Sequence, residues 1–210
     1  MNYLLEQLAL PDDEPVTVAE LKRHLRTFED SSQDADLSAL IRGGREWAEQ
    51  FSGFSLMGQK WRLTFETTPL LIGDVVTGFS YAPYYQRVWR MDSTASGEIQ
   101  LPRAPIISID KFVSVDSLGV ETAIATSAYE LREALSRWPR LVSKGGWLMG
   151  SFRVEFTSGY ADEDSIPVVF KQAIKLWAEA HYDRDPDMMP KYLQAAELLL
   201  KQFQANLQLA

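Results

Sequence analysis

The chain offers few residue types that carry nucleophilic or metal-binding chemistry. It has no cysteine and two histidines, His24 and His181. The lack of thiols excludes disulfides, thiolate nucleophiles and cysteine-based zinc or iron–sulfur sites. Two histidines leave little for imidazole catalysis. His181 lies beside the apolar face of an expected helix, so we expect a partly buried, hydrogen-bonded imidazole there, and a surface role suffices for His24.

Three short motifs resemble functional signatures but lack the required context. Gly78-Phe79-Ser80-Tyr81-Ala82 is similar to a nucleophile elbow, yet no helix is expected after it. Asp183, Asp185 and Asp187 alternate like calcium-loop ligands, but the turn glycine and the bidentate glutamate of such a loop are missing. Lys144-Gly145-Gly146 lacks P-loop spacing and is typical of a turn. We therefore predict no catalytic, cofactor-binding or metal-binding residue, although a site built only from carboxylates would leave no motif.

The charge balance is acidic. The 210 residues include 21 Lys plus Arg and 29 Asp plus Glu, a net charge of -8. This charge argues against a protein that binds nucleic acid through a concentrated basic surface. The stretch from Asp162 to Asp187 contains seven acidic residues and three basic residues. This stretch is either a solvated helix face or an acidic wall past which a polyanion slides without sticking.

Targeting and membrane signals are weak. Residues 1–10 are partly apolar but lack a basic flank and are interrupted by Glu6 and Gln7, so they do not indicate a signal peptide. No apolar run approaches the roughly 20 residues of a membrane helix. We expect a soluble protein made in the cytoplasm.

Helical periodicity dominates both ends of the chain. Thr17 and Glu20 have the spacing of a capping box, which predicts a helix starting at Val18. A second helix is expected over 37–53, capped by Asp34 or Asp36 and ended by Gly53. Helices are also expected from Ser165 to the Asp185-Pro186 stop and from about Pro190 onward. Gly43-Gly44 in mid-helix costs on the order of 1 kcal/mol per residue, so we expect another backbone to approach closely there.

The middle of the chain changes to the period of strands. Trp61, Leu63 and Phe65 alternate with polar residues, which predicts a half-buried strand. Further strands are expected at 98–101, 106–115, 120–126, 128–132 and 152–157. The segment 69–97 is rich in aromatic residues, which either anchor an interface or fill a small core of their own hairpin.

These patterns together predict an α+β fold that is mainly helical: two N-terminal and two C-terminal helices with an inserted antiparallel β-region. We expect one structural domain with three parts. They are 1–58 (leader and helices), 59–160 (the β-rich insert, with the aromatic segment 69–97) and 161–210 (the C-terminal helices).

Four stretches of the sequence resemble the head–tail connector (adaptor) family of tailed bacteriophages. These are 15–26 (PVTVAELK with His24-Leu25-Arg26), the helix 37–53 with its AEQFSG ending, Leu101-Pro102-Arg103-Ala104-Pro105-Ile106, and 154–174 with VEFTSGY, Ile166-Pro167 and KQAI. Together they span most of residues 15–185. Gly43-Gly44 and the long segment 69–97 depart from the family's pattern.

The resemblance implies a structural protein without catalysis or cofactor. It implies a ring of twelve copies in the virion neck, assembled in the host bacterial cytoplasm, from a chain that can be a monomer when isolated. The portal protein would lie on one side of the ring and a tail-side stopper or tail completion protein on the other. DNA would pass through the centre, and no membrane is involved.

The resemblance also implies that a C-terminal segment docks on the portal. On the last expected helix this assigns docking to Tyr192, Leu199, Leu200, Phe203 and Leu207. For subunit or neck contacts the surplus aromatics supply the candidates Tyr81, Tyr84, Tyr85 and Trp89. Two other classes stay open from the residues alone: a carboxylate-dependent hydrolase, or a generic binding protein of a mobile element.

Overall fold

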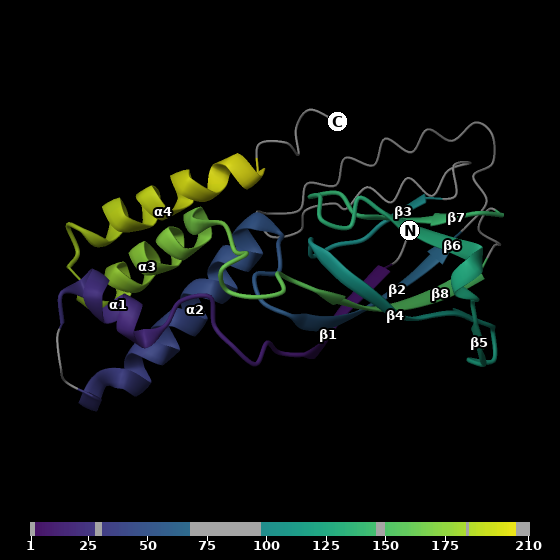
Figure 1. Ribbon diagram of the computed structural model, residues 1–210, viewed down its shortest axis with the longest axis horizontal. Coiled ribbons are helices and arrows are strands. Elements are labelled where there is room, and N and C mark those ends of the chain that lie inside the picture. The colour runs from purple at the N-terminus through teal and green to yellow at the C-terminus, as the bar shows by residue number, and fades with distance from the viewer. Residues whose placement is uncertain (1–2, 28–30, 68–97, 146–149, 184, 205–210) are drawn as a thin grey trace. The chain divides into compact units, whose positions relative to one another are not determined.

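The chain divides into two compact units in a computed structural model, which describes residues 3–27, 31–67, 98–145, 150–183 and 185–204 (Figure 1). The β-unit comprises Met1–Ala9 and Gln59–Ser158, and the helical unit comprises Leu10–Gly58 and Gly159–Ala210. Both units are discontinuous in sequence. The N-terminal residues belong to the β-unit although two helices follow them.

The described residues of the helical unit form four α-helices, and the sequence predicted each of them. Thr17 and Glu20 close the expected capping box around the first helix, with Glu20 N 3.2 Å from Thr17 Oγ1. Gly53 ends the second helix at φ 80°, and its N–H donates to the carbonyl of Glu49. The expected caps Asp34 and Asp36 lie instead in the first turn, where carboxylates favour the positive helix end. The helices are α1 (Val18–Leu25), α2 (Asp34–Ser52), α3 (Val168–Asp183) and α4 (Met189–Gln204), with a 3₁₀ turn at Ser31–Gln33 before α2.

The glycine pair of α2 lies against α3. A Cβ at Gly44 would lie 3.1 Å from Ile174 Cγ2 and 3.2 Å from the Ile174 carbonyl oxygen. A Cβ at Gly43 would lie 2.8 Å from the ring of Trp177. The expected close approach of a second backbone is therefore confirmed, and it explains why poor helix formers occupy the middle of α2.

An aromatic cluster joins α4 to the rest of the helical unit. Phe203 of α4 lies 4.4 Å from Phe170 of α3 and 5.6 Å from Phe54, measured between ring centroids. Ala196 and Leu200 of α4 are fully buried. These contacts make α4 part of the core of its unit.

In the part of the β-unit that the structure describes, the strands form two antiparallel sheets. Five strands follow the order β1-β2-β8-β4-β5, so β8, the last strand in sequence, lies in the middle. Three strands follow the order β3-β7-β6. The strands are β1 (Tyr3–Ala9), β2 (Gln59–Thr67), β3 (Glu98–Gln100), β4 (Ile106–Val115), β5 (Glu121–Ala123), β6 (Tyr129–Arg132), β7 (Arg140–Ser143) and β8 (Gly150–Ser158).

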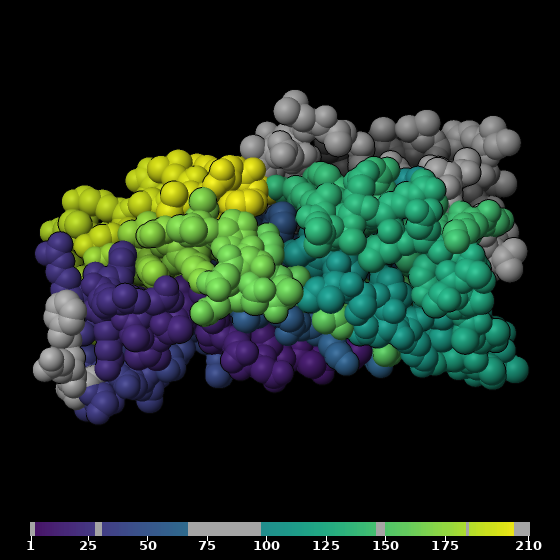
Figure 2. Space-filling model, viewed as in Figure 1, coloured from purple at the N-terminus to yellow at the C-terminus, as the bar shows by residue number. Residues whose placement is uncertain are grey.

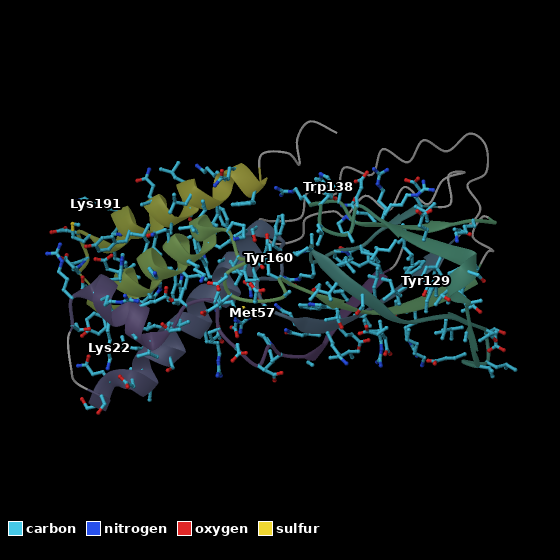
Figure 3. The ribbon with its side chains drawn as sticks, viewed as in Figure 1. Lys22, Met57, Tyr129, Trp138, Tyr160 and Lys191 are labelled. Atoms are coloured by element: carbon cyan, nitrogen blue, oxygen red, sulfur yellow. The ribbon has the colours of Figure 1, made fainter. Side chains whose placement is uncertain are left out.

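The two sheets share one apolar core. The alternation predicted for β2 is confirmed, because Trp61, Leu63 and Phe65 are buried. They pack in one cluster with Ile99 and Leu141 of the smaller sheet. At the edge of this cluster lies Tyr129 (Figure 3), whose burial raises the pKa of its phenol.

The expectation of a mainly helical fold is wrong. The protein is α+β with 40% helix and 31% strand. One cause is β1, which occupies residues expected to form an irregular leader and pairs with β2 in antiparallel register. A second is β7, a four-residue strand that was not expected. Within the described residues, no helix is long and apolar enough to cross a bilayer.

Candidate interaction surfaces

The residues predicted to dock on the portal differ in how far their side chains are exposed. Leu200 is fully buried, and Phe203 is part-buried against Phe170. Tyr192 and Leu199 are half-buried on α4. Leu207 lies outside the described residues, as do the four aromatics predicted for subunit or neck contacts, Tyr81, Tyr84, Tyr85 and Trp89. Of the five docking candidates, Tyr192 and Leu199 are therefore the two that are partly accessible to a partner and do not belong to the aromatic cluster.

Sequence reasoning missed the most exposed apolar residue of α4. Leu198 is 56% exposed. It lies on a flank that also carries Gln194 and Lys201, both exposed. The space-filling view shows α4 in yellow along one side of the helical unit (Figure 2). The outward side of α4 is thus polar with a single large apolar side chain.

Tyr192 belongs to a charged cluster around Glu179 of α3. The negative charge of Glu179 is the main cause that raises the pKa of the Tyr192 phenol, and Asp183 and Asp185 add to it. Glu179 also lies 2.9 Å from His24 Nε2 on α1. His24 therefore ties α1 to α3, which is more than the surface role expected of it.

The acidic stretch from Asp162 to Asp187 does not form one wall. Asp162, Glu163 and Asp164 precede α3, whereas Asp185 and Asp187 follow it. The 16 residues of α3 span about 24 Å at 1.5 Å per residue, so the two acidic groups lie at opposite ends of this helix. All five side chains are exposed.

His181 has the environment that its position predicted. Its Nδ1 lies 2.8 Å from the carbonyl oxygen of Trp177, and the two rings stack at 3.8 Å between centroids. The imidazole is part-buried. A histidine satisfied in this way is a structural residue of α3.

A buried ion network fixes the loops on either side of α2. Arg45 is 2% exposed and its Nε donates to Glu14 at 2.8 Å, while its Nη1 donates to Glu49 at 3.0 Å. The other carboxylate oxygen of Glu49 accepts the backbone N–H of Leu56 at 2.8 Å. Burial acts to lower the pKa of the Arg45 guanidinium, but the charges of Glu49 and Glu14 raise it. Sequence reasoning missed this network, because its charges lie on a helix face that could equally be solvated.

The outer face of the larger sheet carries charges that compensate one another. Four side chains of alternating sign lie in one cross-strand row on β1, β2, β8 and β4: Glu6, Arg62, Glu155 and Lys111. Arg62 Nη2 lies 2.9 Å from Glu155 Oε1. Lys111 donates to Glu121 of β5 at 2.6 Å, and this hydrogen bond lowers the pKa of Glu121. Such a face has no net charge with which to hold a polyanion.

The described carboxyl groups whose pKa departs from its ordinary value have a lowered pKa, unlike the raised pKa of a general acid catalyst. The pKa of Glu20 is lowered, because hydrogen bonds from Thr17 and the charge of Lys175 outweigh the effect of burial. Hydrogen bonds from Ser165 lower the pKa of Asp162. A general acid needs the opposite shift. No group of three or more metal-ligating side chains occurs among the described residues.

Comparison with known proteins gives a clear result at the level of structure. No family model and no curated protein matches the sequence. The fold is similar to a chain in the neck of an empty gene transfer agent particle computed with C6 symmetry, with a TM-score of 0.66 and 22% identity. It is also similar to chains in the virion of the native particle (0.66, 23%) and in the native neck computed with C12 symmetry (0.63, 23%).

Each of these alignments covers 95% of this chain and 94% of the other. The likeness therefore includes both the helical unit and the β-unit. At this level of identity it establishes a shared fold.

Proposed function

We propose that the protein is a structural component of the neck of a tailed phage or phage-like particle, and that it is not an enzyme. The observation that carries the proposal is the shared fold over 95% of the chain with chains of gene transfer agent necks. Those necks were computed with C6 and C12 symmetry. The lowered carboxyl pKa values give no support to the hydrolase alternative.

Within the neck, the role we propose is that of the adaptor below the portal. Twelve copies form a ring through which DNA passes, and a stopper or tail completion protein binds on the tail side. Head-to-tail contacts close into a ring when their rotation divides the circle, and a portal can serve as the template. The chain's charge of -8 and the neutral outer sheet face suit a protein that DNA passes without binding.

For the portal contact we propose the outward side of α4, with Leu198 at its centre and Tyr192 and Leu199 beside it on the same edge. Leu200 and Phe203 then position this surface from inside the helical unit. Deleting α4 would not test the contact, because it would also uncover Phe170. Point substitutions on the exposed side avoid this problem.

The experiment is a binding assay with the portal protein of the same particle. Leu198→Asp is expected to weaken portal binding while the helical content is unchanged, since a charge in an apolar contact is costly to bury. Leu118→Asp is the matched control, because Leu118 is also strongly exposed but lies in the β4–β5 turn. Equal binding by wild type and Leu198→Asp would contradict the docking surface.

The proposed adaptor role is tested with native mass spectrometry of the chain mixed with its portal. A closed assembly with about twelve copies on the portal is expected. A chain that stays monomeric beside an intact portal would overturn the adaptor role.

A further inference from the structure

A polar depression lies between α1 and α3 in the helical unit. Its volume is about 390 Å³, and its lining residues are Glu20, Arg23, His24, Gln172 and Lys175. We call it the α1–α3 pocket. Sequence analysis assigned Glu20 to a capping box and His24 to the surface, but it did not predict that these residues form a pocket.

Cations outnumber acids around the pocket. Lys175 Nζ lies 3.7 Å from Glu20 Oε1, and the charge of Lys171 also acts on Glu20. His24 is held by Glu179. Arg23 is exposed and pairs with no acid among the described residues. On a chain with a net charge of -8, this basic hollow is suited to accept a carboxylate.

The same chain presents a matching acidic surface elsewhere. Asp162, Glu163 and Asp164 form an exposed turn before α3. The backbone N–H of Ser165 donates to Asp162 Oδ1 at 2.7 Å, which fixes the conformation of this turn. Glu163 and Asp164 therefore project from a preorganised support, which lowers the entropy cost of binding.

We propose that the α1–α3 pocket is a subunit contact that receives the acidic turn Asp162–Asp164 of a second copy. Arg23 and Lys175 then pair with Glu163 and Asp164 of that copy. The inference rests on the proposed neck function and names the contact that would build its ring. Because pocket and turn are different surfaces, the contact is head-to-tail and can repeat from copy to copy.

Charge favours a second copy over DNA as the occupant. The pocket contains Glu20 and is bordered by Glu179, so a long phosphate backbone would meet carboxylates as well as cations. The acidic chain as a whole also repels a polyanion. A short turn with two projecting carboxylates fits between these acids.

The test uses charge reversal of each surface in the full chain. The pocket variant is Arg23→Glu/Lys175→Glu and the turn variant is Glu163→Lys/Asp164→Lys. Self-association is measured by sedimentation velocity over a wide range of protein concentrations at low ionic strength. Each variant is expected to weaken it about tenfold or more, and an equimolar mixture of the two is expected to associate again through the swapped charges.

Controls separate this contact from general charge and folding effects. Asp12→Lys/Asp13→Lys changes the net charge as the turn variant does, but on an exposed bend elsewhere, and it is expected to leave association within about twofold. Arg23→Glu alone keeps Lys175 and its contact with Glu20, so it reports on the pocket if the double variant folds poorly. Circular dichroism confirms the fold of each variant.

Three outcomes would overturn the proposal: no self-association of the wild-type chain, unchanged association of both variants, or loss of duplex DNA binding in the pocket variant without any effect on association. A wild-type chain that still enters a neck ring in any of these cases leaves the proposed function intact. A chain that enters no neck refutes the function itself.

Discussion

Replacement of Arg45 by methionine is the sharpest test of the energetics of the helical unit. The guanidinium is 2% exposed and neutralises Glu49, whose side chain is 5% exposed. Methionine keeps the aliphatic part of the side chain but leaves Glu49 buried without its cation. Breaking a buried pair in this way costs about 3–5 kcal/mol. We expect Arg45→Met to lower the free energy of unfolding by that amount.

The assay is urea denaturation, monitored by the circular dichroism signal of the helices. Arg42→Met is the matched control on the same helix, because Arg42 is 68% exposed and its Nε lies 3.9 Å from Glu14. A surface pair of this kind contributes less than about 1 kcal/mol. The two substitutions change the same residue type, three positions apart, and differ in burial.

A double variant identifies the cause of the loss. In Arg45→Met/Glu49→Met neither partner of the buried Arg45–Glu49 pair remains, so we expect it to be more stable than Arg45→Met alone. The reasoning is refuted if Arg45→Met costs no more than Arg42→Met. It is also refuted if Arg45→Met/Glu49→Met is no more stable than Arg45→Met.

Three further predictions concern packing, each measured by urea denaturation. Gly43→Ala should lower the free energy of unfolding by about 1 kcal/mol, because displacement of the Trp177 ring outweighs the gain in helix propensity. Gly58→Ala, where no atom lies within 4 Å of the new Cβ, should be nearly neutral. Equal effects of the two substitutions would contradict the close approach at Gly43. Gly159→Ala should cost more than about 3 kcal/mol, since φ is 123° and the new Cβ would overlap a backbone carbonyl, and a stable variant would show that this geometry is wrong. Leu200→Ala should cost about 2–5 kcal/mol, and a smaller loss would place Leu200 outside the core.

The overlap at Gly159 arises where two loops of the helical unit meet. The carbonyl of Met57 occupies the position of a Gly159 Cβ, and Tyr160 N donates to the Leu56 carbonyl at 3.4 Å. Met57 and Tyr160 lie next to each other in Figure 3. Partial burial at this junction raises the pKa of the Tyr160 phenol.

Periodicity predicted the elements whose side chains have one buried face. Trp61 and Phe65 revealed β2, and the capping box marked the start of α1. Strand β1 gave no such signal because six of its seven residues are exposed, and it is held by backbone pairing to β2. The order of the strands could not be predicted, since strands that pair in the sheet are far apart in sequence.

The candidate surfaces were less predictable than the fold. Apolar spacing marked Leu199, Leu200 and Phe203 as one face of α4, but the direction of that face depends on Phe170, which is distant in sequence. The α1–α3 pocket joins His24 to Glu179, 155 residues away. Its residues are ordinary surface types at ordinary spacing, so only the packing of α1 on α3 brings them together.

The position of β8 has a consequence for synthesis of the protein. This central strand pairs with both β2 and β4, yet it is the last of the three to leave the ribosome. Until residues 150–158 emerge, β2 and β4 each keep an open edge, and open edges invite pairing with other chains. Translation that stalls or ends before Gly150 would therefore yield an aggregation-prone product, and the sheet can form only after about three quarters of the chain has been made.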